Sequence, residues 1–473
     1  MARAKKEAAL TPEERLQAAL VPDWEWPYKL PENWCWTRIG NYVDYVTDYV
    51  ANGSFASLKA NVSIFKDENY ALMVKTQDFA NGFTKSLTYT DKHGYDFLSK
   101  STLHGGELIL SNIGSVGKVF RVPYFDRPMT LASNSVMVKC YNSRDYDWMY
   151  YFLLSPIGFE ELKSITTGTA VPKFNKTDLK TIPLPVPPLA EQQRIVDRIE
   201  SLFAKLDEAK EKAQTVVDSF ETRKAAILHK AFTGELTAKW REEHNISKTT
   251  WGEKKWGDFL QSIEAGKNWS AEGRPPEGTE FGVVKVSAVT WGEFDELESK
   301  TCVVAEQWNS KTQIHKGDFL FSRANTLQLV GNCVIVRNIS KRLMLSDKIL
   351  RFKFDEIAHP RFVLYFTRSR IYREQVEQLA SGNQDGMRNI SQKNLKLVFF
   401  PIPTVVEQIE IISILDRAFA KEQQAKEAAE AVLDQIDLMK KSILARAFRG
   451  ELGTNDPNEE SAVELLKRGL EKK

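Results

Sequence analysis

The sequence repeats itself at a distance of 216 residues, and this repeat constrains the fold more than any other feature of the chain. The residues that recur unchanged 216 positions later are Pro185, Pro187, Glu191, Gln192, Ile195, Phe203, Ala204, Lys205, Ala209, Lys210, Lys224, Ile227, Leu228, Ala231, Phe232, Gly234, Glu235 and Leu236. Fainter matches continue upstream at shifts of 214, 211 and 210. The chain is therefore one unit written twice, and each copy is a divergent block followed by a similar segment.

The similar segments have the pattern of long helices. Their apolar residues alternate steps of four and three, which is the seam of a coiled coil. The first seam consists of Ile195, Ile199, Leu202, Leu206, Ala209, Ala213, Val216 and Phe220. The second consists of Ile411, Leu415, Ala418, Ala425, Ala429, Val432, Ile436, Met439 and Ile443. A helix from Ala190 to Phe232 would run about 65 Å. Two such helices can pack on each other, and ordinary core helices of a bundle are the alternative.

The divergent blocks, residues 34–180 and 251–396, have a different pattern. They contain short β-branched and aromatic runs such as YALMV, ELILS, GVVKV and DFLFS, separated by Gly, Asn and Asp turns. Each block closes with a helix-like stretch, so each is expected to be a mixed α+β domain with its own core. Thr11 to Glu14 has the pattern of a capping box before a short helix, and the tail from Asn455 is expected to form another.

Composition narrows the class of protein. The 473 residues include 65 Lys+Arg and 63 Asp+Glu, which gives a net charge of +2. This balance argues against a chain that holds nucleic acid by charge alone. With 42% hydrophobic residues and no apolar run of membrane-spanning length, we expect a folded cytoplasmic protein without membrane contact. The four isolated cysteines, Cys35, Cys140, Cys302 and Cys333, are expected to be buried free thiols.

The residue patterns of common catalytic sites are missing. The stretch GSVGK at 114–118 has Val119 where a phosphate-binding loop needs Ser or Thr. Glu208 has a nearby lysine but no strand-borne aspartate that would complete a nuclease metal site. His104 and His315 each precede a turn and have no partner at metal-ligand spacing. We therefore expect no catalytic residue, no metal and no cofactor in this chain.

The repeat, together with PLPVPPLAEQQRIV, KAFTGELTAKWR and ARAFRGEL at the helix ends, resembles the specificity (S) subunit of type I restriction-modification enzymes. The resemblance implies that each block is a target recognition domain that reads one half of an asymmetric bipartite site in double-stranded DNA. It implies that the two helices pair antiparallel and dock two methyltransferase (M) subunits, which carry S-adenosylmethionine and methylate adenine N6. Restriction (R) subunits, which use ATP and Mg, would join this core.

The predicted fold class is α+β, with two mixed α/β target recognition domains separated by two long helices that form an antiparallel coiled coil with a pseudo-two-fold internal repeat. The predicted domains are an N-terminal arm at 1–33, recognition domain 1 at 34–184, the first helical region at 185–236, a linker at 237–250, recognition domain 2 at 251–400, the second helical region at 401–452 and a tail at 453–473. A coiled-coil adaptor without sequence-specific DNA binding is the alternative function.

Candidate DNA-binding residues follow from the chemistry of base recognition, in which Arg or Lys binds guanine, Asn or Gln binds adenine, and Ser or Thr binds either. In the first block they are Lys75, Thr76, Ser111, Asn112, Lys118, Ser133, Asn134, Thr169, Lys173, Asn175 and Lys176. In the second they are Lys285, Ser287, Ser322, Arg323, Asn325, Ser346, Lys348, Asn383, Gln384, Arg388 and Asn389.

The charge of each block predicts how the chain holds DNA. Residues 34–168 contain 13 basic and 13 acidic side chains, and residues 251–397 contain 22 and 18. Because counterion release scales with the number of phosphates neutralised, neither block is expected to bind duplex DNA tightly alone. The sequence therefore predicts weak binding by this chain and a stronger grip from its M partners.

Overall fold

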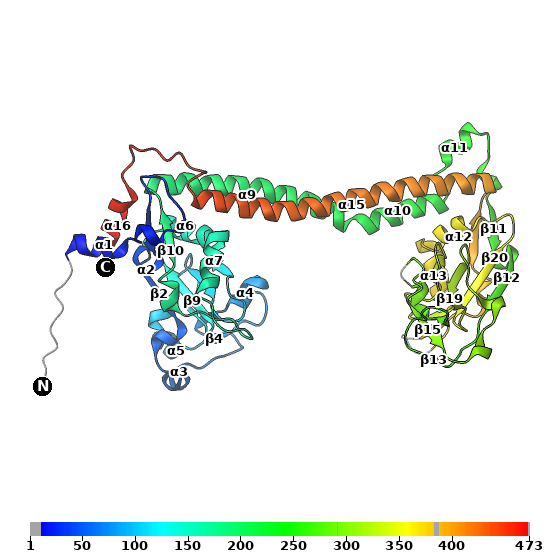
Figure 1. Ribbon diagram of the computed structural model, residues 1–473, viewed down its shortest axis with the longest axis horizontal. Coiled ribbons are helices and arrows are strands. Elements are labelled where there is room, and N and C mark those ends of the chain that lie inside the picture. The colour runs from blue at the N-terminus through cyan, green and yellow to red at the C-terminus, as the bar shows by residue number, and fades with distance from the viewer. Residues whose placement is uncertain (1–10, 291, 383–386, 472–473) are drawn as a thin grey trace. The chain divides into compact units, whose positions relative to one another are not determined.

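We describe the protein from a computed structural model, which defines residues 11–290, 292–382 and 387–471. These residues fall into two compact units (Figure 1). The first unit lies within residues 1–212 and 432–473, and the second comprises residues 213–431. Each unit contains one divergent block and a part of both helical segments. Neither unit is therefore complete without residues from both halves of the sequence.

The long helices are α9 (Leu189–Asp218), α10 (Phe220–Phe232) and α15 (Val405–Phe448). The expectation of one continuous helix from Ala190 to Phe232 is wrong at Ser219, which separates α9 from α10. The Ser219 hydroxyl donates to the carbonyl of Thr215 and accepts from the Arg223 guanidinium. Side-chain bonds of this kind compete with the regular helix and interrupt it.

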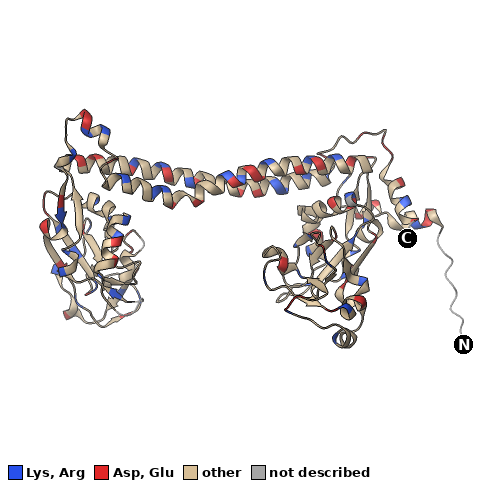
Figure 2. Cartoon of the chain, turned by 180° about the vertical axis from the view of Figure 1, so that it is seen from behind, with Lys and Arg blue, Asp and Glu red and all other residues tan. Residues whose placement is uncertain are grey.

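Within each unit, the two helical segments run antiparallel. In the first unit, Lys210 Nζ lies 3.3 Å from Asp437 Oδ1 and Lys440 pairs with Asp207, so rising numbers on α9 meet falling numbers on α15. In the second unit, Arg223 Nε on α10 lies 2.6 Å from Glu422 Oε2. Figure 2 shows both signs of charge interspersed along these helices. Their outer faces are accordingly solvated, and their inner faces carry the apolar contacts.

The buried face of α15 differs from the predicted seam in its second half. Ile411, Leu415, Ala429 and Ile436 are buried as predicted, and Ile443 is half-buried. Val432 and Met439 are 40% and 49% exposed, and they are not on the buried face.

Two lysines of α15 lie against aromatic rings of the first helical segment. Lys440 Nζ lies 4.9 Å from the centre of the Phe203 ring, and Lys426 Nζ lies 5.0 Å from that of Phe220. The aliphatic stem of a lysine can cover apolar surface while its ammonium stays solvated. The pattern counted Lys440 as polar, so it placed the neighbouring Met439 on the buried face. In the first helical segment, the predicted residues Ile195, Ile199, Leu202, Leu206, Val216 and Phe220 are all buried or half-buried.

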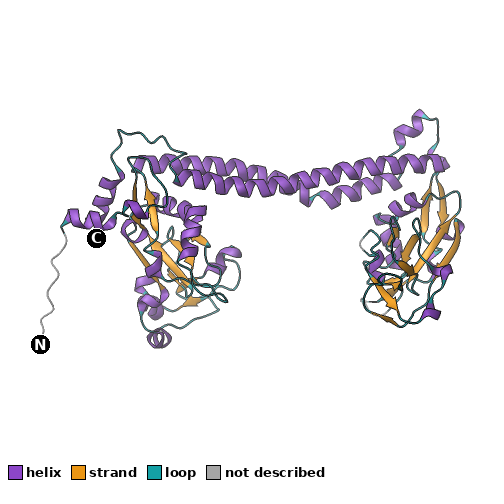
Figure 3. Ribbon diagram, in the orientation of Figure 1, coloured by secondary structure: helices purple, strands orange, loops and turns teal. Residues whose placement is uncertain are grey.

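The first block folds into two four-stranded sheets in the described residues, with helices packed around them (Figure 3). The first sheet has the order β2 (Tyr45–Asp48), β9 (Ser135–Lys139), β6 (Leu108–Ser111) and β7 (Val119–Arg121). The second has the order β4 (Tyr89–Thr90), β3 (Ala71–Val74), β8 (Met129–Leu131) and β5 (Thr102–Leu103). The helices are α2 (Ile39–Tyr42), α3 (Phe55–Asn61), α4 (Thr76–Ala80), α5 (Lys92–Phe97), α6 (Ser143–Leu154), α7 (Pro156–Ser164) and α8 (Lys176–Leu179).

The second block repeats the first sheet and three neighbouring strands of the second. Its first sheet has the order β12 (Leu260–Ala265), β20 (Ile349–Phe354), β16 (Phe319–Ser322) and β18 (Cys333–Ile335). Its second has the order β13 (Ala271–Glu272), β15 (Ser299–Cys302), β14 (Phe281–Val284) and β19 (Arg342–Met344). The edge strand β13 lies beyond β15, at the opposite edge from β5 in the first block. β14 pairs parallel to β19, as β3 pairs parallel to β8 in the first block. Its helices are α12 (Pro360–Phe366), α13 (Arg370–Leu379) and α14 (Gln392–Leu395), and α11 (Ala238–Glu243) lies in the predicted linker.

Each block is pinned at both of its ends. β1 (Cys35–Arg38) pairs antiparallel with β10 (Pro183–Val186), and β11 (Gly252–Lys255) pairs antiparallel with β22 (Phe399–Ile402). Because β10 leads into α9 and β22 leads into α15, the two ends of each block meet at the start of a long helix. All other elements of the block lie between these two strands in the sequence.

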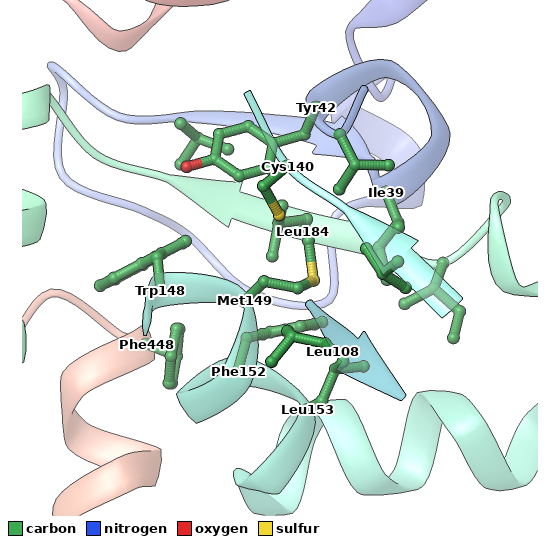
Figure 4. Close-up of a cluster of buried hydrophobic side chains, with 14 of the residues drawn as sticks. Ile39, Tyr42, Leu108, Cys140, Trp148, Met149, Phe152, Leu153, Leu184 and Phe448 are labelled. Atoms are coloured by element: carbon green, nitrogen blue, oxygen red, sulfur yellow. The ribbon is translucent and has the colours of Figure 1, made fainter. Parts of the chain in front are cut away.

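The core of the first unit joins the block to the end of α15. Leu108 and Leu110 of β6 pack in one apolar cluster and Ile109 packs in another, because successive side chains of a strand point to opposite faces. Figure 4 shows Phe448, the last residue of α15, against Trp148 and Phe152 of α6, with ring centres 4.5 and 5.4 Å apart. Residues almost 300 positions apart thus share one core, and all four cysteines are buried and free as expected.

The terminal segments of the described chain belong to the first unit. The predicted capping box is present, since Thr11 and Glu14 exchange backbone–side-chain hydrogen bonds ahead of α1 (Pro12–Ala19). The predicted tail helix is α16 (Ala462–Leu470), whose Ala462 and Leu466 are buried in the core of this unit.

A fully buried glutamate lies in the first turn of each long helix. Glu191 of α9 accepts hydrogen bonds from the Asn455 backbone N–H at 2.8 Å, from Thr454 Oγ1 at 2.9 Å and from Arg194 Nε at 2.9 Å. Burial alone would raise the pKa of Glu191, but these hydrogen bonds together outweigh it and lower the pKa below its ordinary value. A Cβ at Gly453 would lie 1.8 Å from Glu191 Oε1, so a side chain at position 453 would collide with this carboxylate.

Glu407 of α15 has the same role in the second unit. It accepts from Arg241 Nη1 at 2.6 Å, from Thr237 Oγ1 at 2.7 Å and from Trp251 Nε1 at 3.0 Å. Arg241 is itself buried, so this is an ion pair inside the protein. In both units the glutamate binds the segment that follows the Gly-Glu-Leu tripeptide of the other repeat.

Replacement of Glu191 by glutamine should destabilise the first unit at neutral pH by about 2 kcal/mol, because a charged acceptor of several hydrogen bonds is lost. Since folding lowers the pKa of Glu191, its stabilising effect is present above its ordinary value of 4.5 and is lost as pH falls through the lower folded value. Denaturant unfolding at several pH values should therefore show a difference between wild type and variant that shrinks below about pH 4.5.

The exposed Glu208, which forms an i,i+4 ion pair with Lys212 on the same helix, provides the control. Glu208→Gln should leave the unfolding curve almost unchanged at every pH. A loss of stability in Glu191→Gln that stayed constant down to pH 3 would contradict the role of the charge.

Candidate nucleic-acid interface

The predicted DNA-binding residues of the first block gather at one edge, where three loops meet. The loop after β6 pairs with segment 166–176 through a bridge between Ile113 and Lys173, and the Phe174 N–H donates to the carbonyl of Asn112 at 3.1 Å. Ser111 pairs with Ser135, which directly follows the turn at Ser133 and Asn134. Ser111, Asn112, Ser133, Asn134, Lys173 and Asn175 are therefore neighbours, although they are up to 64 positions apart in the sequence.

The second block forms the same edge with different side chains. β17 (Ala324–Asn325) pairs with β21 (Arg388–Asn389), so Asn325 lies opposite Arg388. The Arg323 N–H donates to the carbonyl of Lys348 at 3.0 Å, and the Ile390 N–H donates to that of Arg323 at 2.9 Å. This brings together Ser322, Arg323, Asn325, Ser346, Lys348, Arg388 and Asn389. Asn383 and Gln384 lie outside the described residues.

Several of the predicted residues have hydrogen-bond or ion-pair partners within the protein. Lys75 Nζ donates to the Ser86 carbonyl at 2.8 Å, and Thr76 follows it as the first residue of α4. Lys176 pairs with Asp48 at 2.9 Å. In the second block Lys285 lies 3.8 Å from Glu298, which also accepts from the Ser287 hydroxyl at 2.5 Å. Lys118, Thr169 and Lys173 are exposed.

Three asparagines that were expected to bind adenine hold the loops together. Asn175 Oδ1 caps α8 by accepting from the backbone N–H groups of Thr177 and Asp178, at 2.8 and 2.9 Å. Asn112 Nδ2 donates to the Phe174 carbonyl at 3.2 Å, and Asn325 Nδ2 donates to Thr290 Oγ1 at 3.3 Å. The same amide that reads adenine also caps helices and bridges loops, so the sequence does not separate the two roles.

Comparison with known proteins agrees with this geometry. Residues 46–216 and 248–431 match the family described as the type I restriction modification DNA specificity domain. These two ranges cover most of the chain. The chain belongs to this family. The first match contains the first block from residue 46 onward and the second contains the whole second block, each with its loop edge and most of the helical segment that follows.

Relatives in this family are similar to the chain over long stretches, at about a quarter sequence identity. The specificity subunit of the type I restriction enzyme EcoKI from Escherichia coli (strain K12) is 26% identical over 307 residues, which are 64% of this chain and 64% of that protein. The chain thus matches slightly less than two thirds of this relative's length. The MjaVIII specificity subunit from Methanocaldococcus jannaschii is 23% identical over 450 residues, 91% of this chain and 95% of that protein.

Solved structures of the family show the same fold. The HsdS subunit from Thermoanaerobacter tengcongensis covers 90% of this chain and 99% of its own, at 18% identity and a TM-score of 0.58. A chain solved in work on complex assembly and conformational transition of the type I R-M system has 19% identity, a TM-score of 0.60, and covers 90% of this chain and 100% of its own.

The described residues add two negative findings. They contain no group of three or more His, Cys, Asp or Glu side chains arranged to hold a metal ion. Among them, no helix has the length and apolar character needed to cross a membrane.

Sequence reasoning missed a group of arginines beside the loop edge of the second block. Arg368, Arg370 and Arg373, at the start of α13, line a cleft of about 660 Å³. Their only sequence signal is the stretch RSRIYR, which resembles an ordinary charged helix face. In the folded protein these arginines lie next to Thr290 and Asn332, which are up to about 80 residues earlier in the sequence.

The cap at Asn175 gives a direct test of its role. Asn175→Ser keeps an oxygen that can cap α8, and Asn175→Ala removes it at a cost of about 1 kcal/mol to the local fold. If the cap is the role of Asn175, affinity for duplex carrying the recognition site should stay within about twofold of wild type in the serine variant. Binding lost equally in both variants would show that the amide itself contacts DNA.

Proposed function

We propose that this chain is the DNA-specificity subunit of a type I restriction-modification complex, and that each recognition block reads one half of an asymmetric bipartite site in double-stranded DNA. One observation carries the proposal: the same edge of three loops is built twice with different side chains. Asn112 and Lys173 at the first edge correspond to Arg323 and Asn389 at the second, through the matching bridges Ile113–Lys173 and Ala324–Asn389. Different donors and acceptors on one scaffold select different bases.

The helical segments supply the spacing in this proposal. Their antiparallel contacts within each unit support a paired helical spacer with pseudo-two-fold symmetry, the single-chain counterpart of a DNA-binding dimer. In such a dimer, the geometry of the protein sets the distance between half-sites. Two similar helical segments also suit two copies of one partner, so we place two M subunits there, with R subunits joining that core.

Exposed apolar side chains on α15 support a partner at the helices. Leu438 and Met439 are 64% and 49% exposed in the first unit, and Val406 and Ile409 are 65% and 53% exposed in the second. Apolar side chains grouped on a solvated helix mark contacts with another protein. In the proposed complex, methyl transfer from S-adenosylmethionine takes place in the M subunits, and ATP and Mg act in the R subunits. This chain contributes recognition and has no catalytic residue of its own.

Exchange of one block tests the reading of half-sites. When residues 34–180 are replaced by the equivalent block of another family member, sequencing of methylated sites in the host should show one altered half-site and one unchanged half-site. The reciprocal exchange of residues 251–396 is the matched control and should alter the other half. A change in both halves after either exchange would refute the modular proposal.

A comparison of DNA affinity with and without the M subunits shows which subunit supplies most of the binding. Because the charge of the chain is only +2, titration of a labelled duplex with this chain alone should give markedly weaker binding than titration with the chain and its M subunits. Equal affinities would show that this chain supplies the grip itself. No sequence-dependent binding in either titration would favour the coiled-coil adaptor instead.

A further inference from the structure

A cleft in the second unit concentrates basic side chains. It has a volume of about 660 Å³, and its basic lining residues are Lys224 of α10 and Arg368, Arg370 and Arg373 around the start of α13. The carboxylates in the same lining are Glu221 and Glu293, so positive charge is in excess. Glu293 is also paired with Arg337 at 3.2 Å. The cleft therefore offers several guanidinium groups to an anion that enters it.

The cleft adjoins the loop edge that contains Arg323 and Asn325. Thr290, which lines the cleft, accepts from Asn325 Nδ2 through its hydroxyl at 3.3 Å and from Asn332 Nδ2 through its carbonyl at 2.9 Å. Arg373 Nη1 donates to the carbonyl of Gln328 in the same loop at 3.3 Å. A ligand that binds along the loop edge thus passes directly beside the arginines.

The arginines retain donors for a ligand. Arg368 Nη2 donates to the Gly292 carbonyl at 2.8 Å, and within the described part of the chain Arg368 forms no ion pair with a carboxylate. Arg370 pairs with Glu374 at the surface, where such pairs contribute little and exchange easily. Arg373 Nε lies 3.2 Å from Glu377 Oε1, while its buried Nη2 has no hydrogen-bond partner among the described residues. Guanidinium groups of this kind bind phosphate oxygens bidentately.

The equivalent surface of the first unit lacks these charges. At the shift of 214 residues that aligns the two copies here, Leu154, Pro156 and Phe159 occupy the positions of Arg368, Arg370 and Arg373. Phe159 is 48% exposed, so this surface is apolar where its counterpart is basic. The cleft is therefore a feature of the second unit and not a requirement of the shared fold.

We infer that the cleft binds a phosphate group of the DNA backbone beside the half-site that the second block reads. This inference rests on the proposed function and adds to it a phosphate contact that fixes the position of the duplex on one block only. Phosphate contacts hold a protein in register on DNA without reading its sequence. The arginines should therefore contribute equally to binding of the recognition site and of unrelated duplex.

The test uses the full chain with its M subunits, and the variants Arg370→Gln and Arg368→Gln/Arg370→Gln/Arg373→Gln. Affinity for two labelled duplexes, one with the recognition site and one with a shuffled sequence, is measured over a series of salt concentrations. The triple variant should bind both duplexes about tenfold or more weakly at low salt, and its slope of log affinity against log salt should fall by about 1, as expected for the loss of one phosphate contact. The single variant should reduce the slope by a part of that amount.

Arg417→Gln, which removes an exposed arginine of α15 outside the cleft lining, is the matched control and should leave the slope unchanged. Because Arg370 is exposed, its single variant keeps the test valid if the triple variant folds poorly.

An unchanged slope in both variants would overturn the inference. So would loss of M-subunit assembly with unchanged DNA affinity of the chain alone, because the occupant would then be an acidic segment of the partner. If added inorganic phosphate stabilised wild type but not the triple variant while DNA binding stayed equal, the site would be one for free phosphate. Absence of DNA binding by the wild-type complex would instead overturn the proposed function.

Discussion

The rest of the structure depends on one buried carboxylate at the start of each long helix. Glu191 binds the backbone beyond α15, and Glu407 binds Thr237 and Arg241 beyond α10. A buried charge is tolerated only when its hydrogen-bond partners are in place. Each unit therefore closes only when residues from both repeats meet, and this requirement joins the helical segments to the blocks. The two repeats are interleaved, and neither folds as a separate half of the sequence.

This closure explains why the blocks can diverge while the segments around them stay similar. The ends of each block meet in the strand pairs β1–β10 and β11–β22, next to the proline-rich starts of α9 and α15. Everything between those pairs enters and leaves at one place and packs on the helices mainly through α6 in the first block and α12 in the second. Cys35 opposite Val186 and Gly252 opposite Ile402 fix that place in both copies. The loop edges can then change their side chains without disturbing the contacts that complete the unit.

The sequence predicted the elements that local rules control. The capping box at Thr11 and the helix ends at Gly234 and Gly450, which have positive φ, follow from backbone chemistry that a few residues determine. Its failures have a common cause, which is that one side chain can serve two purposes. Lys440 has a polar head and an apolar stem, so a polar–apolar pattern placed Met439 on the seam instead. Asn175 caps α8 in the folded loop, a contact that its assignment as a base-reading residue did not include. The arginine cleft joins segments that lie far apart in the chain.

The two blocks share a scaffold but differ in electrostatics, and this difference gives them unequal tasks. Residues 34–180 contain 16 basic and 14 acidic side chains and have an apolar surface at Phe159, whereas residues 251–396 contain 22 and 18 and have the arginine cleft. A nearly neutral block gains little from counterion release, so it is expected to have little affinity for DNA of any sequence on its own. In the proposed complex, binding of the second block would hold the first close to the same duplex through the chain that connects them, and binding of the first would become intramolecular. Weak intrinsic affinity then favours specificity, because a block with little attraction for phosphate is retained mainly where its base contacts are satisfied.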